Sequence, residues 1–330
     1  MRPIYLLLVL VIAGCSHIRG NGVWKGDRIP AKEKKEIDGM MADVYKAIKD
    51  KDGAYFKNSA SKSFSDNDLK VVDTILSAAE LDTRTSDYSV VGEYYIQDTV
   101  SAVSQRIAGT DPAGYAYTFD FIPKSSRTAI CLFAVPDVYT QNKWLISCIF
   151  SNEESKWRLS SFFIGLYACN GMTAPQFYTH ARGLIDAQKP VGAMLYLQMA
   201  MNVLTPSGPR FHYKNEEVIK DFFTAVHQNV DTLVTGATAK SAIPTRPQIL
   251  SIEPLPLQGN FYPLIMYRSA ISIDNAKDLE KENDLLNEKI GAMLPGIRQL
   301  SDTILYKATN NNPTNGQQMN TYGFIKIGAR

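Results

Sequence analysis

The chain lacks the features of a nucleic-acid-binding or transmembrane protein. Its formal net charge is only +2, and Lys and Arg are spread along the 330 residues without a basic run, so nucleic acid is not an expected partner. Beyond residue 14 no apolar run approaches the ~20 residues that cross a bilayer. The composition, 45% hydrophobic and 21% charged, is that of a globular protein with material for two or three domains.

The common motifs of catalysis and metal binding are also missing. The sequence contains no GxSxG, no GxxxxGK[ST] and no GxGxxG, and its histidines show neither HExxH nor HxH spacing. No CxxC pair occurs, so a zinc site is not expected. We therefore expect a non-catalytic protein with no metal and no cofactor.

The N-terminus is the most informative segment. Arg2 is followed by the uninterrupted apolar stretch Ile4–Ile12, then by Ala13, Gly14 and Cys15. The stretch is too short to span a bilayer, but it has the length of a secretory signal core. The small pair Ala13-Gly14 fits a signal peptidase, and a cysteine stands directly after it.

The four residues "IAGC" resemble the lipobox of bacterial lipoproteins. The resemblance implies residues 1–14 as a signal peptide, a diacylglycerol on the Cys15 sulfur and stable membrane anchoring. The alternative is a plain signal peptide with a chance cysteine. Ser16 in place of Asp, and no acidic cluster after it, favour the outer membrane facing the periplasm. Residues 15–30 contain three glycines and a proline and predict a flexible tether.

Helices precede strands in the next part, 31–170. Helical periodicity predicts helices over 31–49 and 66–79. Period-two alternation then predicts an antiparallel meander, so the fold class is α+β. The layout resembles the nuclear transport factor 2-like (cystatin-like) fold, with N-terminal helices on a curved sheet. The predicted strands are 88–96, 99–107, 115–122, 128–135, 143–150 and 157–166.

A helical segment, 171–236, and a C-terminal α+β domain, 237–330, complete the chain. Helices 174–188 and 191–204 resemble one tetratricopeptide-type hairpin, which more often packs as a spacer than forms a peptide groove. A third helix is predicted over 215–233, and residues 236–247 form a linker by composition. The remainder predicts β-β-α-β-β, over 249–254, 262–273, 276–293, 303–309 and 322–327. This whole order resembles uncharacterised bacterial envelope proteins.

Cys131 and Cys148 lie on two neighbouring predicted strands. A hairpin that turns near residues 139–140 places them opposite each other, with Phe133 opposite Ile146. A cross-strand disulfide is one outcome, although its geometry is demanding. Buried free thiols that pack as small hydrophobic groups are the other, and the one we favour.

Two acids inside apolar strands are the best candidates for a site. Asp120 lies in "YAYTFDFIP", and Glu93 lies in "VVGEYYIQD" beside Tyr94. If either faced a cavity, desolvation would raise its pKa and make it a general base. In the alternative, both lie on a solvated sheet face. The candidate cavity residues are Asp120, Glu93, Tyr94 and Tyr117.

Three functions fit these observations. The leading one is a membrane-anchored, non-catalytic envelope lipoprotein that acts as a binding or scaffold protein, with a protein partner at residues 171–236 or a small-molecule ligand. The second is a small-molecule-binding protein or hydrolase of the nuclear transport factor 2-like fold, because such enzymes use carboxylates without a local motif. The third is a purely structural part of an envelope complex.

Overall fold

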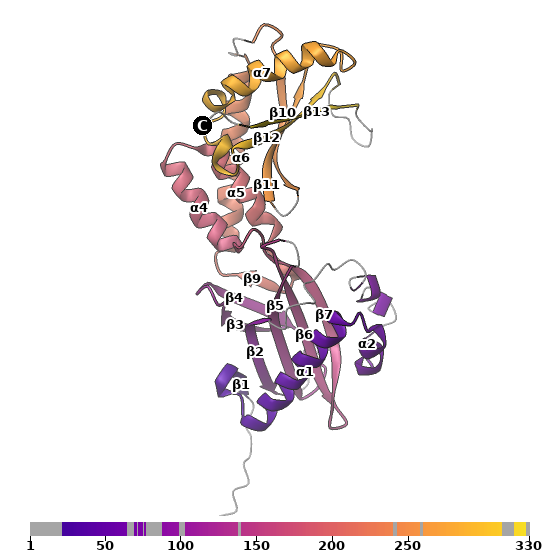
Figure 1. Cartoon of the computed structure of the whole chain (residues 1–330). Coiled ribbons are helices and arrows are strands. Elements are labelled where there is room, and N and C mark those ends of the chain that lie inside the picture. The colour runs from indigo at the N-terminus through magenta and orange to yellow at the C-terminus, as the bar shows by residue number, and fades with distance from the viewer. Residues whose placement is uncertain are drawn as a thin grey trace, which may run out of the picture.

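The computed structural model describes residues 22–64, 69–70, 72–74, 76, 88–98, 103–137, 140–239, 243–257, 260–311 and 320–327. Cys15 and the signal segment lie outside these residues. So does most of the helix expected over 66–79, of which residues 69, 70, 72–74 and 76 are helical. The chain is α+β, and its three sheets, rich in antiparallel pairing, are all open in the described residues. The elements form two lobes, one built on α1 and the long strands and one containing α7 (Figure 1).

The main sheet of the N-terminal lobe has the strand order β1-β2-β5-β6-β7, with every pair antiparallel. Helices α1 (Ala31–Lys49) and α2 (Gly53–Ser59) share a buried apolar core with one face of it. The expected register of the hairpin is confirmed: Cys131 lies opposite Cys148, and Phe133 opposite Ile146. The strands are β1 (Gly22–Lys25), β2 (Ser89–Gln97), β5 (Arg127–Pro136), β6 (Lys143–Glu153) and β7 (Lys156–Ala168).

The tether expected up to Pro30 is wrong from Gly22 onward. Residues Gly22–Lys25 form β1, which pairs with β2, and residues Gly26–Arg28 form a 3-10 helix. The Trp24 ring packs 5.4 Å, centroid to centroid, from the ring of Tyr95. The glycines around this segment predict a loop. The strand forms nevertheless, because it pairs with β2, which is distant in the sequence.

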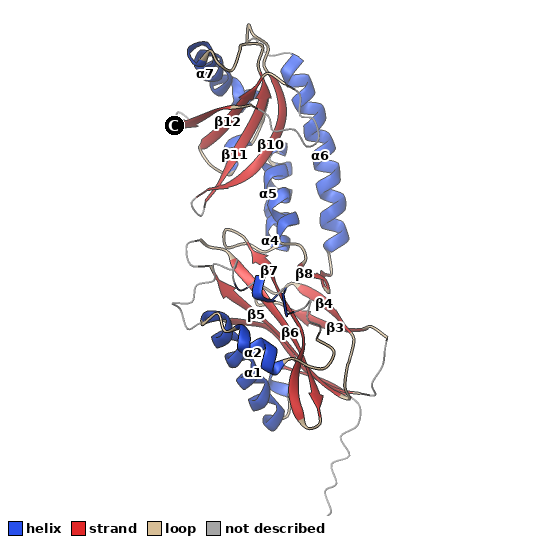
Figure 2. Cartoon of the chain, turned by 90° about the vertical axis from the view of Figure 1, so that its right-hand side faces the viewer, coloured by secondary structure: helices blue, strands red, loops and turns tan. Residues whose placement is uncertain are grey.

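The simple meander is also wrong. Strand β2 pairs with β5, because β3 (Gln105–Thr110) and β4 (Ala116–Phe121) leave the main sheet and pair with the short β9 (Phe211–Tyr213). The strand expected over 99–107 begins only at Gln105. The three-stranded sheet shares an apolar core with the face of the main sheet that α1 does not cover. The lobe is therefore layered as helix, sheet and second sheet (Figure 2).

Helices α4 (Ala174–Asp186) and α5 (Pro190–Asn202) follow the sheets and connect the lobes. The C-terminal end of α5 belongs to the core between the two N-terminal sheets, and its first half belongs to the core of the C-terminal lobe. After β8 (Pro206–Pro209) and β9 comes α6 (Glu216–Ala239), which extends beyond the expected end at Leu233. The linker expected from Gly236 is therefore helical over its first four residues, 236–239.

The C-terminal lobe has a four-stranded sheet of order β10-β11-β12-β13. Strands β11 and β12 are parallel and are connected through α7, whereas the outer pairs are antiparallel. The strand expected over 262–273 ends at Arg268. Helices α5, α6 and α7 share one apolar core with this sheet. The elements are β10 (Gln248–Leu257), β11 (Asn260–Arg268), α7 (Ala276–Met293), β12 (Thr303–Thr309) and β13 (Tyr322–Ile327).

None of the helices within the described ranges is long and apolar enough to cross a membrane.

Candidate functional site

A cavity of about 640 Å³ lies in the N-terminal lobe, where β4, β7 and the segment around β8 come together. Its walls combine aromatic side chains, among them Phe121 and Phe163, with polar and charged groups. This size and mixed lining are typical of a small-molecule site. The polar groups used in the argument below are Asp120, Lys124, Ser160, Ser161, Ser207 and Arg210.

Asp120 lines this cavity, as one of the sequence hypotheses required, but it is held by a cation. The Arg106 guanidinium donates from Nε to Oδ1 (2.6 Å) and from Nη2 to Oδ2 (2.7 Å) of Asp120. These hydrogen bonds keep the pKa of the Asp120 carboxyl below its ordinary value. A carboxylate whose pKa is lowered in this way binds protons weakly and is a poor general base.

Alternation along β4 explains where Asp120 points. Tyr117, Phe119 and Phe121 are buried, while Thr118 and Asp120 are half-buried on the other side of the strand. The backbone N–H of Asp120 donates to the carbonyl oxygen of Arg210 (2.8 Å). This hydrogen bond continues the β4–β9 pairing and places the segment that carries Arg210 beside Asp120.

Arg210 and Ser207 supply the second polar wall. The Arg210 guanidinium donates to the Ser161 hydroxyl of β7. The Ser160 hydroxyl donates to the carbonyl of Ile149 (3.0 Å). Ser207 is different: it is 1% exposed, and its hydroxyl has no hydrogen-bond partner within the described part of the chain. A buried hydroxyl without a partner is costly, and Ser207 is also one of the residues that line the cavity.

Gly165 on β7 allows β8 to approach the main sheet. A Cβ atom added at this position would lie 2.2 Å from the carbonyl oxygen of Pro206, which is backbone and cannot swing away. Since Pro206 precedes Ser207, this close approach also positions the unpartnered hydroxyl at the cavity wall.

Glu93 lies on the opposite face of the main sheet, below α1, and does not meet Asp120. It is 5% exposed, with Oε2 3.0 Å from Lys34 Nζ. Its Oε1 has no hydrogen-bond partner among the residues described. Burial raises the pKa of Glu93 despite the attraction of Lys34. Of the two acids, Asp120 therefore lines the cavity, whereas Glu93 is buried elsewhere and lies on no solvated face.

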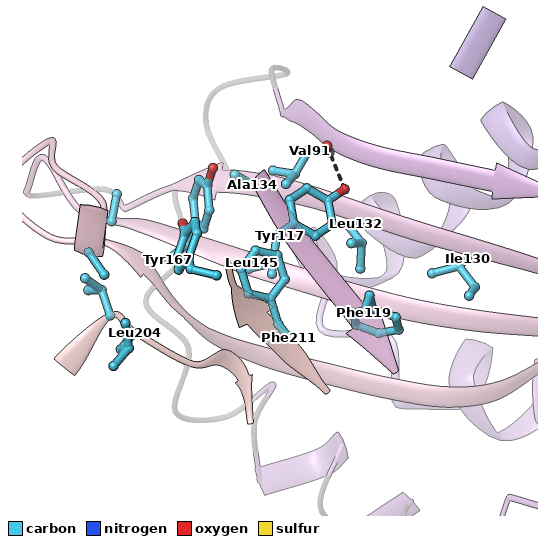
Figure 3. Close-up of a cluster of buried hydrophobic side chains, with 14 of the residues drawn as sticks. Val91, Tyr117, Phe119, Ile130, Leu132, Ala134, Leu145, Tyr167, Leu204 and Phe211 are labelled. Atoms are coloured by element: carbon cyan, nitrogen blue, oxygen red, sulfur yellow. Dashed lines mark hydrogen bonds between the residues drawn. The ribbon is translucent and has the colours of Figure 1, made fainter. Parts of the chain in front are cut away.

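Tyr94 and Tyr117 are packing residues of the intersheet core and do not line this cavity. Tyr117 lies among Phe119, Leu132, Leu145 and Phe211, with its hydroxyl directed at the carbonyl of Val91 (Figure 3). Desolvation raises the pKa of Tyr117, so its phenol stays protonated at neutral pH.

The cysteines Cys131, Cys148 and Cys169 are buried and free in the structure. Burial raises the pKa of the Cys131 and Cys148 thiols and brings that of Cys169 to about 12. Thiols with such pKa values are poor nucleophiles, because the reactive form is the thiolate.

Among the described residues, no histidine is hydrogen-bonded to Asp120. His212, on the neighbouring β9, has Nδ1 2.9 Å from Glu216 and Nε2 2.9 Å from the Pro209 carbonyl, so both ring nitrogens are occupied. His227 bonds to Asp231 (3.0 Å). Among the residues described, no group of three or more His, Cys, Asp or Glu side chains could hold a metal ion.

The sequence pattern indicated Asp120 but not the residues that complete its site. Arg106 precedes it by 14 residues, and Ser207 and Arg210 follow by about 90. Of these residues, only Arg106 could have been predicted from the sequence. It lies on the predicted strand 99–107, which directly precedes the predicted strand that carries Asp120. Comparison of the chain with protein-family models, with curated proteins and with solved structures gives no significant match.

Proposed function

We propose that this chain is a non-catalytic lipoprotein of the cell envelope, anchored through Cys15 in the outer membrane, whose N-terminal lobe binds a small anionic molecule. The anchor rests on the lipobox-like Ile12-Ala13-Gly14-Cys15. The finer fold assignment belongs to the same proposal: a nuclear transport factor 2-like lobe, a tetratricopeptide-like hairpin and a ββαββ C-terminal domain. The helix-covered curved sheet of the N-terminal lobe supports it.

The observation that carries the binding function is the charge balance of the cavity. Among the described lining residues the acid is Asp120, which is paired with Arg106, and Lys124 and Arg210 add two further cationic side chains to the wall. The hydroxyl of Ser207 has no internal partner, and Phe163 adds an aromatic wall. A ligand with a carboxylate or phosphate and an apolar ring would meet each of these groups.

The same geometry argues against the hydrolase alternative. Hydrolysis by this class of site needs a base within hydrogen-bond reach of a water or nucleophile. Asp120 is committed to Arg106, and His212 to Glu216 and Pro209. The helical hairpin does not support a peptide-binding groove, because α5 is buried in the cores of both lobes.

Calorimetric titration of the detergent-solubilised full chain with phenyl phosphate and with benzoate tests the proposal. We expect saturable binding that Arg210→Gln weakens by about tenfold or more, since charge-assisted hydrogen bonds contribute ~1.5–3 kcal/mol. Ser207→Ala should weaken binding by a smaller factor without lowering the free energy of unfolding. Arg182→Gln, at an exposed position on α4, is the matched control.

Two results would overturn the proposal. One is the absence of binding by either probe together with the absence of any small anion in mass spectra of the purified protein. The other is unchanged binding in Arg210→Gln. Turnover of phenyl phosphate that is lost in Asp120→Asn would restore the hydrolase alternative.

A further inference from the structure

A second cavity, of about 760 Å³, lies in the C-terminal lobe and has no part in the function proposed above. It is located where β11 and β12 end, at Arg268–Ala270 and Asn310, next to the last turn of α6 and the start of β10. Strands β11 and β12 are parallel neighbours, so their carboxyl ends meet at one edge of the sheet. Crevices outside the carboxyl ends of parallel strands are the usual ligand sites of such sheets.

The lining of this cavity is basic and polar. Two guanidinium groups, of Arg246 and Arg268, face it, and it contains no carboxylate among its described lining residues. On α6, Asp231, one turn before the lining residue Thr235, is bonded to His227. The described part of the wall therefore carries two guanidinium groups and no carboxylate. The remaining polar lining residues are Thr235, Gln248, Ser269 and Asn310.

Arg268 is held in place by its neighbours. Its Nη2 donates to the side-chain oxygen of Gln248 (2.5 Å), the residue directly opposite on β10. Asn310 fixes the loop that follows β11: it donates to the carbonyls of Ser269 (3.1 Å) and Ile271 (2.6 Å) and accepts from the N–H of Ile273 (2.9 Å). These contacts give one wall of the cavity a fixed geometry in the absence of a ligand.

Arg246 is held by its backbone in an unfavourable conformation. Its φ of +50° is in the left-handed region, and its N–H closes a turn to the carbonyl of Ile243 (3.0 Å). A residue with a side chain is strained in this region, and glycine would avoid that strain. Its guanidinium has no hydrogen bond or ion pair within the described residues. Arg246 is exposed, so its guanidinium at the cavity wall is available to a ligand.

We propose that this pocket binds the phosphate group of a small solute, with Arg246 and Arg268 as its two charged contacts. Guanidinium groups bind phosphate oxygens through paired N–H donors, which an ammonium group cannot do. The Ser269 hydroxyl lies in the same wall and can donate to a further oxygen, whereas the Thr235 hydroxyl already donates to the carbonyl of Asp231 (2.9 Å). The phosphate can be free or part of a glycerophosphate headgroup, and the experiment separates these two sources.

The test is calorimetric titration of the detergent-solubilised full chain with inorganic phosphate and, separately, with glycerol 3-phosphate. We expect binding of both, weakened about tenfold or more by Arg246→Gln and by Arg268→Gln. Arg246→Gly should weaken binding to the same degree while keeping or raising the melting temperature, since it removes the strain together with the charge. Arg182→Gln should leave binding unchanged. A preference of about tenfold for glycerol 3-phosphate would identify a headgroup as the source, and equal binding would identify phosphate alone.

The proposal fails if neither probe binds, or if Arg246→Gly leaves the affinity unchanged in a protein that is still folded. Phosphate binding that responds only to Arg210→Gln would place the anion in the N-terminal cavity, which would support the function proposed above and overturn this second site. The two proposals can therefore fail separately.

Discussion

Tyr94 and Tyr117 meet hydroxyl to hydroxyl at 2.9 Å, one from each sheet of the N-terminal lobe. The Tyr94 hydroxyl also lies 3.2 Å from the carbonyl of Ala108 in the small sheet, and the Tyr117 hydroxyl 3.2 Å from the carbonyl of Val91 in the main sheet, so two phenolic protons are shared among three contacts. Val91 is the residue at which the β2–β5 register shifts, so it lacks a partner in β5. The tyrosine from the other sheet supplies the hydrogen bond that this bulge loses.

This pair should therefore couple the two sheets energetically. We expect Tyr117→Phe to lower the free energy of unfolding by about 1–3 kcal/mol, because it leaves the buried Val91 carbonyl without a donor. Tyr94→Phe should cost less. A double-mutant cycle by urea unfolding should give a coupling of about 0.5 kcal/mol or more between the hydroxyls. Strict additivity of the two substitutions would contradict the arrangement.

Gly165→Ala tests the close approach of β8 to β7. The added Cβ would meet the Pro206 carbonyl at 2.2 Å, so β8 must move away. We expect a loss of about 1–3 kcal/mol in stability together with weaker ligand binding in the N-terminal cavity, because Ser207 moves with β8. Gly183→Ala, on α4 where nothing lies within 4 Å of the added atom, is the matched control and should not destabilise. Equal stabilities of the two variants would rule out the contact.

Glu93→Gln should change the pH dependence of stability. Burial raises the pKa of Glu93 above its ordinary 4.5, so the folded protein binds this proton more tightly than the unfolded chain. Stability therefore falls as the pH rises from 4.5 through the raised pKa. Glutamine carries no charge at any pH. The free energy of unfolding of the variant, measured with urea between pH 4 and pH 8, should therefore not show this decrease.

Asp120→Asn is the comparison for this measurement because its shift has the opposite sign. The pKa of Asp120 is lowered from 3.8, so its contribution is present above that value and is lost as the pH falls through the folded pKa.

A pronounced loss of stability at neutral pH in Glu93→Gln would mean that the ion pair with Lys34 outweighs the cost of burial.

Cys15→Ala tests the anchor. Without the thiol no diacylglycerol can be attached, so we expect an uncleaved precursor or a soluble form in place of a membrane-bound lipoprotein. Cell fractionation and the mass of the mature chain measure this directly. If the variant fractionates and migrates like the parent, the resemblance to a lipobox is misleading.

Local patterns in the sequence predicted most elements but not their pairing. The register of Cys131 with Cys148 follows from alternation and a short turn, and it is confirmed. The pairing of β2 with β5 crosses an excursion of some thirty residues that no local pattern reveals. The short β8 was not predicted, because Pro206, Gly208 and Pro209 resemble a loop and its position depends on Gly165 in another strand.

The candidate site shows the same limit. An acid inside an apolar strand made Asp120 stand out, yet its chemistry is decided by Arg106 on the adjacent strand. Glu93 had the same sequence signature but lies against α1, because β2 is covered on both faces, by α1 on one and by the small sheet on the other. Periodicity assigns a residue to one side of a strand, and only the packing of the layers shows what covers that side.

The pairing of β1 with β2 limits the distance between Cys15 and the folded N-terminal lobe. Seven residue steps separate Cys15 from Gly22, and a fully extended chain covers at most ~3.6 Å per step, or roughly 25 Å in all. With a lipid on Cys15, this connection would therefore keep β1 close to the bilayer. The lobe that contains α7 lies at the far end of the molecule from β1 (Figure 1). A lipid on Cys15 would then hold at the bilayer the end of the molecule that carries β1, and not the lobe that carries the Arg246 pocket.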